Sequence, residues 1–150
     1  MKNLFQRASF FSQNGTIEVR RTHDPVVISV SIRKQSLDLW QRAKNKNPFL
    51  FDGDLFYFQK IRFRNKRLII HGNYDAYRFF YLRKNLKKIK QKIRPVAVTG
   101  MCLVEVEAKR FLLVGKRSHR VTQYPGCWDL VPAGGVHAGV ERRGKIDVKK

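Results

Sequence analysis

The sequence predicts an α+β fold of mixed strands with two or three helices, and three observations lead to this prediction. Short segments rich in β-branched and aromatic residues favour strands. Between them lie segments whose apolar residues recur every three or four positions, which favours amphipathic helices. Proline and glycine mark the ends of these segments. At 150 residues the chain is long enough to bury one core.

The first half of the chain is predicted to contain two β-hairpins with a short helix between them. The four strands are expected at 17–20, 26–32, 55–63 and 67–71. The first two strands are expected to pair with each other, and so are the last two, because only a short turn separates the members of each pair. The helix is expected from Ser36, and it must end before Pro48 because the residue before proline is disfavoured in the helical region.

A longer amphipathic helix is predicted between residues 77 and 94. Apolar residues recur there at alternate spacings of three and four, and Pro95 ends the pattern. Only basic charges occupy the opposite face, at Arg83, Lys84, Lys87, Lys88, Lys90 and Lys92. This face is either a solvated surface or a stripe that binds phosphates. Strand-like alternation returns after the helix in 94–107 and 109–118, which are predicted to be joined by a short turn.

The charge of the chain is strongly positive and unevenly distributed. Thirty-two Lys and Arg against 11 Asp and Glu give a net charge of +21. The residues before Pro95 hold 22 of the basic and 6 of the acidic side chains, so that +16 of the +21 lies there. We therefore divide the chain into a basic N-terminal region of strands and amphipathic helix, 1–94, and a second unit, 95–150. Such a surface is expected to attract nucleic acid or other polyanions without sequence preference.

Several classes of protein are disfavoured by the composition. The two cysteines, Cys102 and Cys127, form no C-x-x-C pair, so neither a disulfide framework nor a zinc ribbon is indicated. No apolar run is long enough for a membrane span, and the N-terminus has no uninterrupted apolar segment of the kind that signal peptides carry. We therefore expect a cytoplasmic protein without a membrane span.

The second unit contains four features in a fixed order. A strand that ends in basic residues, 112–117, is followed by a loop with a proline-glycine pair, 125–126, then by a tryptophan, Trp128, and then by a Pro-Ala-Gly-Gly turn, 132–135. This order resembles the Nudix hydrolase superfamily, whose members run through such elements into the Nudix box. The resemblance implies that the C-terminal half is an incomplete Nudix α/β/α sandwich. More weakly, Trp40 and the segments 47–53 and 67–80 resemble the leader of the UDP-glucose pyrophosphatase branch.

The resemblance also implies magnesium chemistry, for which this chain lacks the expected ligands. The Nudix box runs G-x5-E-x7-R-E-x2-E-E, and its closing glutamates hold Mg²⁺ ions that polarise the phosphoryl oxygens and activate water. Val140 takes the first glutamate position if Gly134 opens the box, and Glu141 takes it if Gly135 does. In both registers the closing glutamates would fall beyond Lys150. We therefore expect a truncated and inactive chain that binds Mg²⁺ poorly.

The candidate site residues follow from the same resemblance. Arg117, at a strand end, is expected to contact a diphosphate, and Gly134 and Gly135 are expected to form a turn that lets phosphate approach the backbone. Glu141 is the one candidate metal ligand, although a surface residue paired with nearby arginines is the simpler interpretation. Trp128 is expected to pack beneath the glycine turn, and Asp129 is expected to form a turn.

Two functions are therefore compatible with the sequence. The first is a Nudix-type hydrolase of a nucleoside diphosphate linked to another moiety, for example a UDP-sugar, which is inactive as this chain. The alternative is a non-catalytic basic module whose Lys and Arg side chains and aromatic rings bind nucleic acid.

Overall fold

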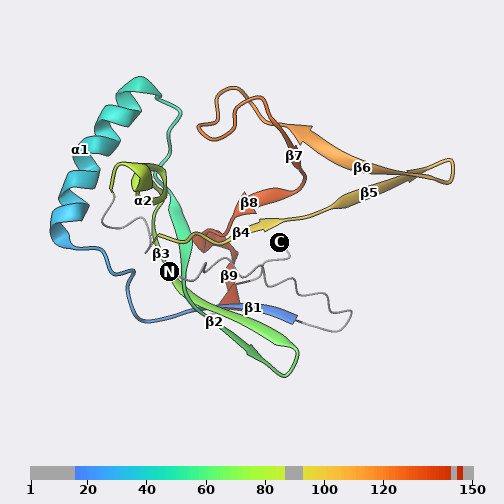
Figure 1. The fold of residues 1–150 in the computed structure, drawn as a ribbon, viewed down its shortest axis with the longest axis horizontal. Coiled ribbons are helices and arrows are strands. Elements are labelled where there is room, and N and C mark those ends of the chain that lie inside the picture. Colours follow the sequence, from blue (N-terminus) through green and yellow to red (C-terminus); the bar gives the residue numbers. More distant parts are fainter. Residues whose placement is uncertain (1–15, 87–92, 143–144, 147–150) are drawn as a thin grey trace, which may run out of the picture.

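A computed structural model describes residues 16–86, 93–142 and 145–146, and its fold is α+β (Figure 1). The helices in these residues are α1 (Val30–Lys46) and α2 (Tyr77–Tyr81), with 3₁₀ turns at Leu82–Lys84 and Ala138–Val140. The strands are β1 (Thr16–Arg21), β2 (Asp54–Arg64), β3 (Arg67–Ala76), β4 (Ala97–Thr99), β5 (Cys102–Val106), β6 (Lys109–Lys116), β7 (Trp128–Leu130), β8 (Ala133–Gly135), β9 (Glu141–Arg142) and β10 (Lys145–Ile146). They form sheets of five, three and two strands.

The five-stranded sheet has the order β2-β3-β1-β10-β9. Strands β2 and β3 form the second hairpin that the sequence predicted. Strand β1 lies parallel to β3 and antiparallel to β10. The first predicted hairpin is therefore wrong, because β1 finds its partners far along the chain.

The segment 26–32 is not a strand, although its β-branched residues favour one. Val26 and Ile28 are buried in the core, and helix α1 begins at Val30, six residues before the predicted start at Ser36. Burial against other elements outweighs the local preference, since strand propensity reflects packing on a half-buried surface rather than an intrinsic backbone preference. The predicted end of this helix is confirmed, with Asn47 as its C-cap.

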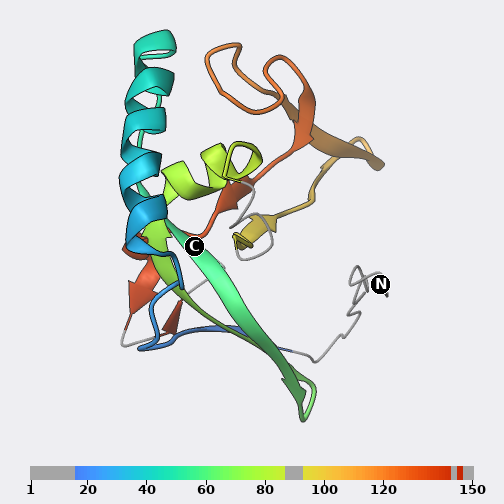
Figure 2. The same cartoon turned by 60° about the vertical axis from the view of Figure 1, so that its left-hand side comes forward.

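The larger hydrophobic cluster lies between α1, α2 and the end of the β2–β3 hairpin nearest the helices. Figure 2 shows α1 and α2 side by side over this part of the sheet. The buried members are Val26, Ile28, Trp40, Leu50, Tyr57, Phe79, Leu82, Leu86 and Ile93. Four of these belong to the apolar face predicted for 77–94. The predicted burial of this face is therefore confirmed at those positions.

The single long helix predicted over 77–94 is not present in the described part of that segment. Helix α2 ends at Tyr81, and a 3₁₀ turn, Leu82–Lys84, follows it. Most of the predicted basic stripe, at 87–92, lies outside the described residues. At its near end, the guanidinium of Arg83 stacks on the ring of Phe80 at 4.3 Å.

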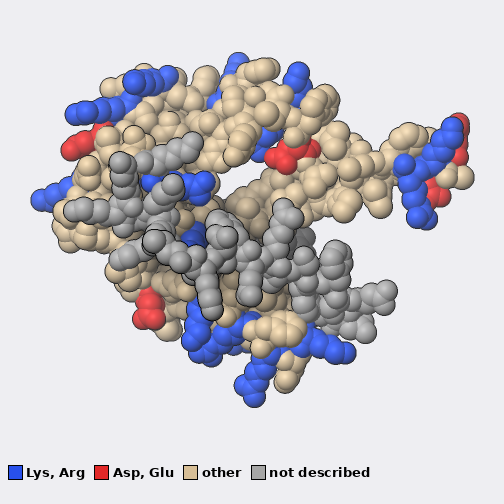
Figure 3. Space-filling view, in the orientation of Figure 1, with Lys and Arg blue, Asp and Glu red and all other residues tan. Residues whose placement is uncertain are grey.

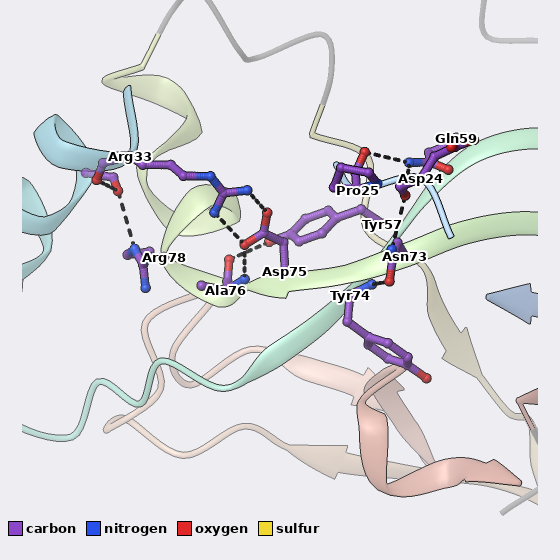
Figure 4. A network of polar contacts seen from close by, with 11 residues as sticks. Asp24, Pro25, Arg33, Tyr57, Gln59, Asn73, Tyr74, Asp75, Ala76 and Arg78 are labelled. Carbon is purple, nitrogen blue, oxygen red and sulfur yellow. Dashed lines mark hydrogen bonds and ion pairs between the residues drawn. The ribbon is translucent and has the colours of Figure 1, made fainter. Parts of the chain in front are cut away.

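A polar network around Asp75 joins α1 to the end of β3 (Figure 4). The Arg33 guanidinium donates two hydrogen bonds to the Asp75 carboxylate, at 3.1 and 2.6 Å. Arg33 and Arg78 both lie over the ring of Phe79, which is 0 % exposed. The Tyr57 hydroxyl donates to the Ala76 carbonyl, and burial raises the pKa of Tyr57. The network fixes α1 and α2 against the sheet.

A second, smaller cluster packs residues from both sides of Pro95. It contains Val19, Phe56, Val136 and Ile146. The Phe56 N–H donates to the Val136 carbonyl at 2.9 Å, and the Val96 N–H donates to the Phe56 carbonyl at 2.9 Å. The division of the chain at Pro95 stays a prediction, and the two regions share this core.

Strands β5 and β6 form the hairpin predicted after Pro95, and it projects away from the rest of the fold (Figure 1). Its turn residues, Glu107 and Ala108, have φ values of 49° and 60°, as a two-residue hairpin turn requires. Large apolar side chains are exposed along it at Leu103, Val104, Val106, Phe111, Leu112, Leu113 and Val114. Among the described residues, no helix is both long and apolar enough to cross a membrane.

Candidate ligand-binding cavity

An open cavity of about 870 Å³ lies between the two halves of the chain. Its walls are the loop after α1, the start of α2, strand β4, the loop after β6 and strand β8. Cavities of this size bind small molecules and cofactors in other proteins. Three of the four residues that the sequence selected, Arg117, Gly134 and Gly135, line it together.

Arg117 is held in a fixed orientation at the end of β6. Its Nη1 lies 3.0 Å from the Asp129 carboxylate, and its Nε donates to the Gln123 carbonyl at 3.1 Å. The Arg117 backbone N–H donates to the Cys127 carbonyl at 2.9 Å. Asp129 therefore orients the guanidinium and also offsets part of its charge. A phosphate in the cavity would compete with Asp129 for this side chain.

Gly134 and Gly135 line the cavity as part of a strand, so the predicted glycine turn is wrong. They belong to β8, where Gly134 pairs with Val98 and Gly135 with Ala97 of β4. A Cβ at Gly135 would lie 2.5 Å from Leu55 Cδ1, whereas a Cβ at Gly134 would have no atom within 4 Å. A side chain at Gly135 would therefore displace the end of the Leu55 side chain, whereas the position beside Gly134 is open space.

Glu141 does not line the cavity. Its carboxylate lies 3.6 Å from Arg21 Nη1. Glu141 therefore forms an ion pair with an arginine, which is the simpler interpretation given above. Within the described residues no three His, Cys, Asp or Glu side chains come together as a possible metal site. Mg²⁺ prefers several oxygen ligands in octahedral geometry, and these residues do not supply them. No catalytic step through magnesium follows from this arrangement.

Sequence reasoning missed the aromatic wall of the cavity. Phe49 and Phe51, in the loop after α1, are 64 % and 81 % exposed and both line the cavity. The Arg120 guanidinium lies 5.2 Å from the centre of the Phe49 ring, which joins the loop after β6 to this wall. The sequence feature that could have indicated this wall is the Phe-Leu-Phe run after Pro48. Only the central leucine of this run is buried in the structure.

Trp128 does not pack beneath the glycines, as the sequence predicted. It lies on β7 opposite Lys116 of β6 and is 68 % exposed. Pairing with the projecting β5–β6 hairpin places this ring outside both clusters of buried residues.

One wall of the cavity is braced by Tyr74. Its hydroxyl donates to the His137 carbonyl at 3.4 Å, and His137 lines the cavity. Burial, with a smaller effect of the Glu141 charge, raises the pKa of Tyr74 to about 12. The hydroxyl therefore keeps its proton, and its ability to donate, at neutral pH.

Comparisons with known proteins add no family to this geometry. No protein-family model matches the chain, and no curated protein matches it significantly. The assignment of a ligand therefore depends on the residues that line the cavity and on the resemblance of residues 112–135 to the Nudix superfamily.

Proposed function

We propose that this cavity binds a nucleoside diphosphate linked to another moiety, and that the chain is of Nudix lineage. The observation that supports this most is the meeting of Arg117 and Arg120 with the exposed rings of Phe49 and Phe51 in one cavity. Guanidinium groups bind phosphate oxygens through charge-assisted hydrogen bonds, and exposed aromatic rings stack on nucleobases. Gly134 lines the same cavity, and the open space beside it leaves room for a diphosphate.

The order of motifs in 112–135 supports the same ligand class, because the Nudix resemblance implies that a diphosphate binds at Gly134 and Gly135. A UDP-sugar is the probe that the weaker resemblance of the N-terminal half suggests. We also propose a reducing compartment, the cytoplasm, since Cys102 and Cys127 are both free thiols.

Calorimetric titration with UDP-glucose tests the binding site. Arg117→Gln should weaken binding by roughly ten- to hundredfold, because a hydrogen bond from a charged donor contributes about 1.5–3 kcal/mol. Asp129→Asn should strengthen binding, because it releases the Arg117 guanidinium from its ion pair. Gly134→Phe should abolish binding by filling the cavity.

Arg110→Gln is the matched control for this titration, because Arg110 lies on the exposed hairpin and pairs with Glu105. It should leave the affinity unchanged. Equal losses in Arg110→Gln and Arg117→Gln would show that net charge, and not the cavity, determines binding. Absence of binding in the unsubstituted chain would exclude the proposal.

The second expectation concerns turnover. The 150-residue chain should show no magnesium-dependent hydrolysis of UDP-glucose or ADP-ribose above buffer. Among the described residues, the acids that line the cavity are Asp54 and Asp129, Asp129 is paired with Arg117, and no three possible metal ligands come together. A coupled phosphate assay after phosphatase treatment measures this. Phosphate release that both a chelator and Glu141→Gln abolish would show instead that these residues contain an unorthodox metal site.

A further inference from the structure

The outer half of the β1–β2–β3 sheet carries basic side chains on one face. Directly paired residues share a face, and alternate residues along a strand do so as well. The register pairs Lys60 with His71, Arg62 with Ile69, and Arg64 with Arg67 across β2 and β3. On the other side of β3, Arg20 pairs with His71 and Glu18 with Ile69. We name Arg20, Lys60, Arg62, Arg64 and Arg67 the basic sheet face.

This face is accessible in the described structure. All five basic side chains are exposed, and Lys and Arg gather over the β2–β3 hairpin at the lower edge of Figure 3. Helix α1 covers the other end of the sheet, around Tyr57, and leaves the outer half uncovered by described elements (Figure 1). An ion pair on this face joins Arg20 to Glu18 at 2.9 Å.

The positive charges of this face affect one shared neighbour, His71. His71 lies at its centre, and its pKa is lowered by burial and by the neighbouring charges of Arg62, Arg20 and Lys60, against the opposing effect of Glu18. The positive side chains therefore produce a local potential that disfavours a further positive charge and favours an anion.

The geometry of the face fits an extended polyanion. Alternate residues on a strand stand about 6.6 Å apart and neighbouring strands lie about 4.8 Å apart, so the long side chains form a grid of repeated positive charges. An anionic lipid surface is usually held by apolar side chains as well as by charge. Ile69, which is half-buried, is the apolar residue among the paired positions of this face. These features favour a chain of phosphates over a membrane.

We propose that the basic sheet face binds the phosphate backbone of a nucleic acid. This site is separate from the cavity and uses none of its residues. The basic residues of this site lie on paired strands of the sheet. Arg20 is far from the others in the sequence, and the five come together only when the sheet forms. Recognition through phosphates alone carries no sequence information, so the site accepts mixed sequences.

The test is fluorescence anisotropy with a mixed-sequence oligonucleotide, single-stranded and duplex, over a range of salt concentrations. The variant is Arg62→Gln with Arg64→Gln and Arg67→Gln. Its affinity should fall by more than tenfold at low salt, and the slope of log K against log salt should become shallower by about 3, or about 1 for each lost phosphate contact. The control variant removes three charges from α1 instead, by Lys34→Gln, Arg42→Gln and Lys44→Gln, all at exposed positions.

The α1 control should retain most of the affinity and slope, and Arg62→Lys with Arg64→Lys and Arg67→Lys should also bind, because lysine supplies the same charge to a phosphate. On addition of oligonucleotide, the His71 imidazole signals should shift in NMR spectra of the unsubstituted chain. Equal losses in the sheet and α1 variants would overturn the proposal, since net charge would then explain binding. Binding to phosphatidylserine vesicles with none to either oligonucleotide would overturn it in favour of a membrane surface.

Discussion

Gly72→Ala should destabilise the fold by about 3 kcal/mol, at the upper end of the usual cost of overpacking a core. Gly72 is buried in β3, and a Cβ there would lie 2.2 Å from the Tyr57 carbonyl oxygen and 2.8 Å from the Phe56 ring. The oxygen belongs to the neighbouring strand and cannot move away without breaking the pairing. Urea unfolding followed by circular dichroism measures the loss as a lower midpoint with an unchanged slope.

Gly134→Ala is the matched control for this substitution. Gly134 is also a strand glycine, but a Cβ at this position would meet no atom within 4 Å. Its unfolding midpoint should stay close to that of the unsubstituted chain. If both alanine variants lose stability equally, the contact of Gly72 with the β2 backbone is not the cause.

Phe79→Ala should cost about 3–5 kcal/mol, the usual range for removing a buried phenylalanine ring. Phe79 is 0 % exposed within the larger cluster, and the guanidiniums of Arg33 and Arg78 lie 5.2 and 4.9 Å from its centre. Its loss leaves a cavity and removes the surface on which both arginines rest. Because native domains are typically stabilised by about 5–15 kcal/mol in total, this cost should lower the urea midpoint of unfolding strongly.

Phe51→Ala is the control for the loss of a ring. Phe51 is 81 % exposed, so its removal should change the free energy of unfolding by less than about 0.5 kcal/mol. It lines the cavity, however, and should weaken UDP-glucose binding. A large loss of stability in Phe51→Ala together with a small one in Phe79→Ala would contradict the core described above.

Elements that depend on neighbouring residues were predictable. The β2–β3 and β5–β6 hairpins follow from short turns between strand-like segments, and the positive φ values at Asn65, Lys66, Glu107 and Ala108 are the local conformation that such turns need. The end of α1 follows from Pro48, which restricts the residue before it. In these cases the relevant interactions lie within a few residues.

The candidate site was predictable in part. Arg117, Gly134 and Gly135 were selected from motif order, and the fold brings them to one cavity. The conformation of the two glycines was not predictable, because their strand exists only through pairing with β4, some 35 residues earlier. The same holds for Phe49 and Phe51, whose exposure in the same cavity as Arg117 depends on how the loop after α1 meets the loop after β6.

The sequence by itself determined the fold class, the β2–β3 and β5–β6 hairpins, the basic charge and the apolar face of 77–94. Each of these depends on composition or on contacts between near neighbours. Only the tertiary structure decided that Val26 and Ile28 enter the core without forming a strand and that β1 pairs with β3 in parallel. Those outcomes depend on burial against residues far along the chain, and a local pattern contains no information about such partners. The basic sheet face has the same origin, since its charges come together only through strand register.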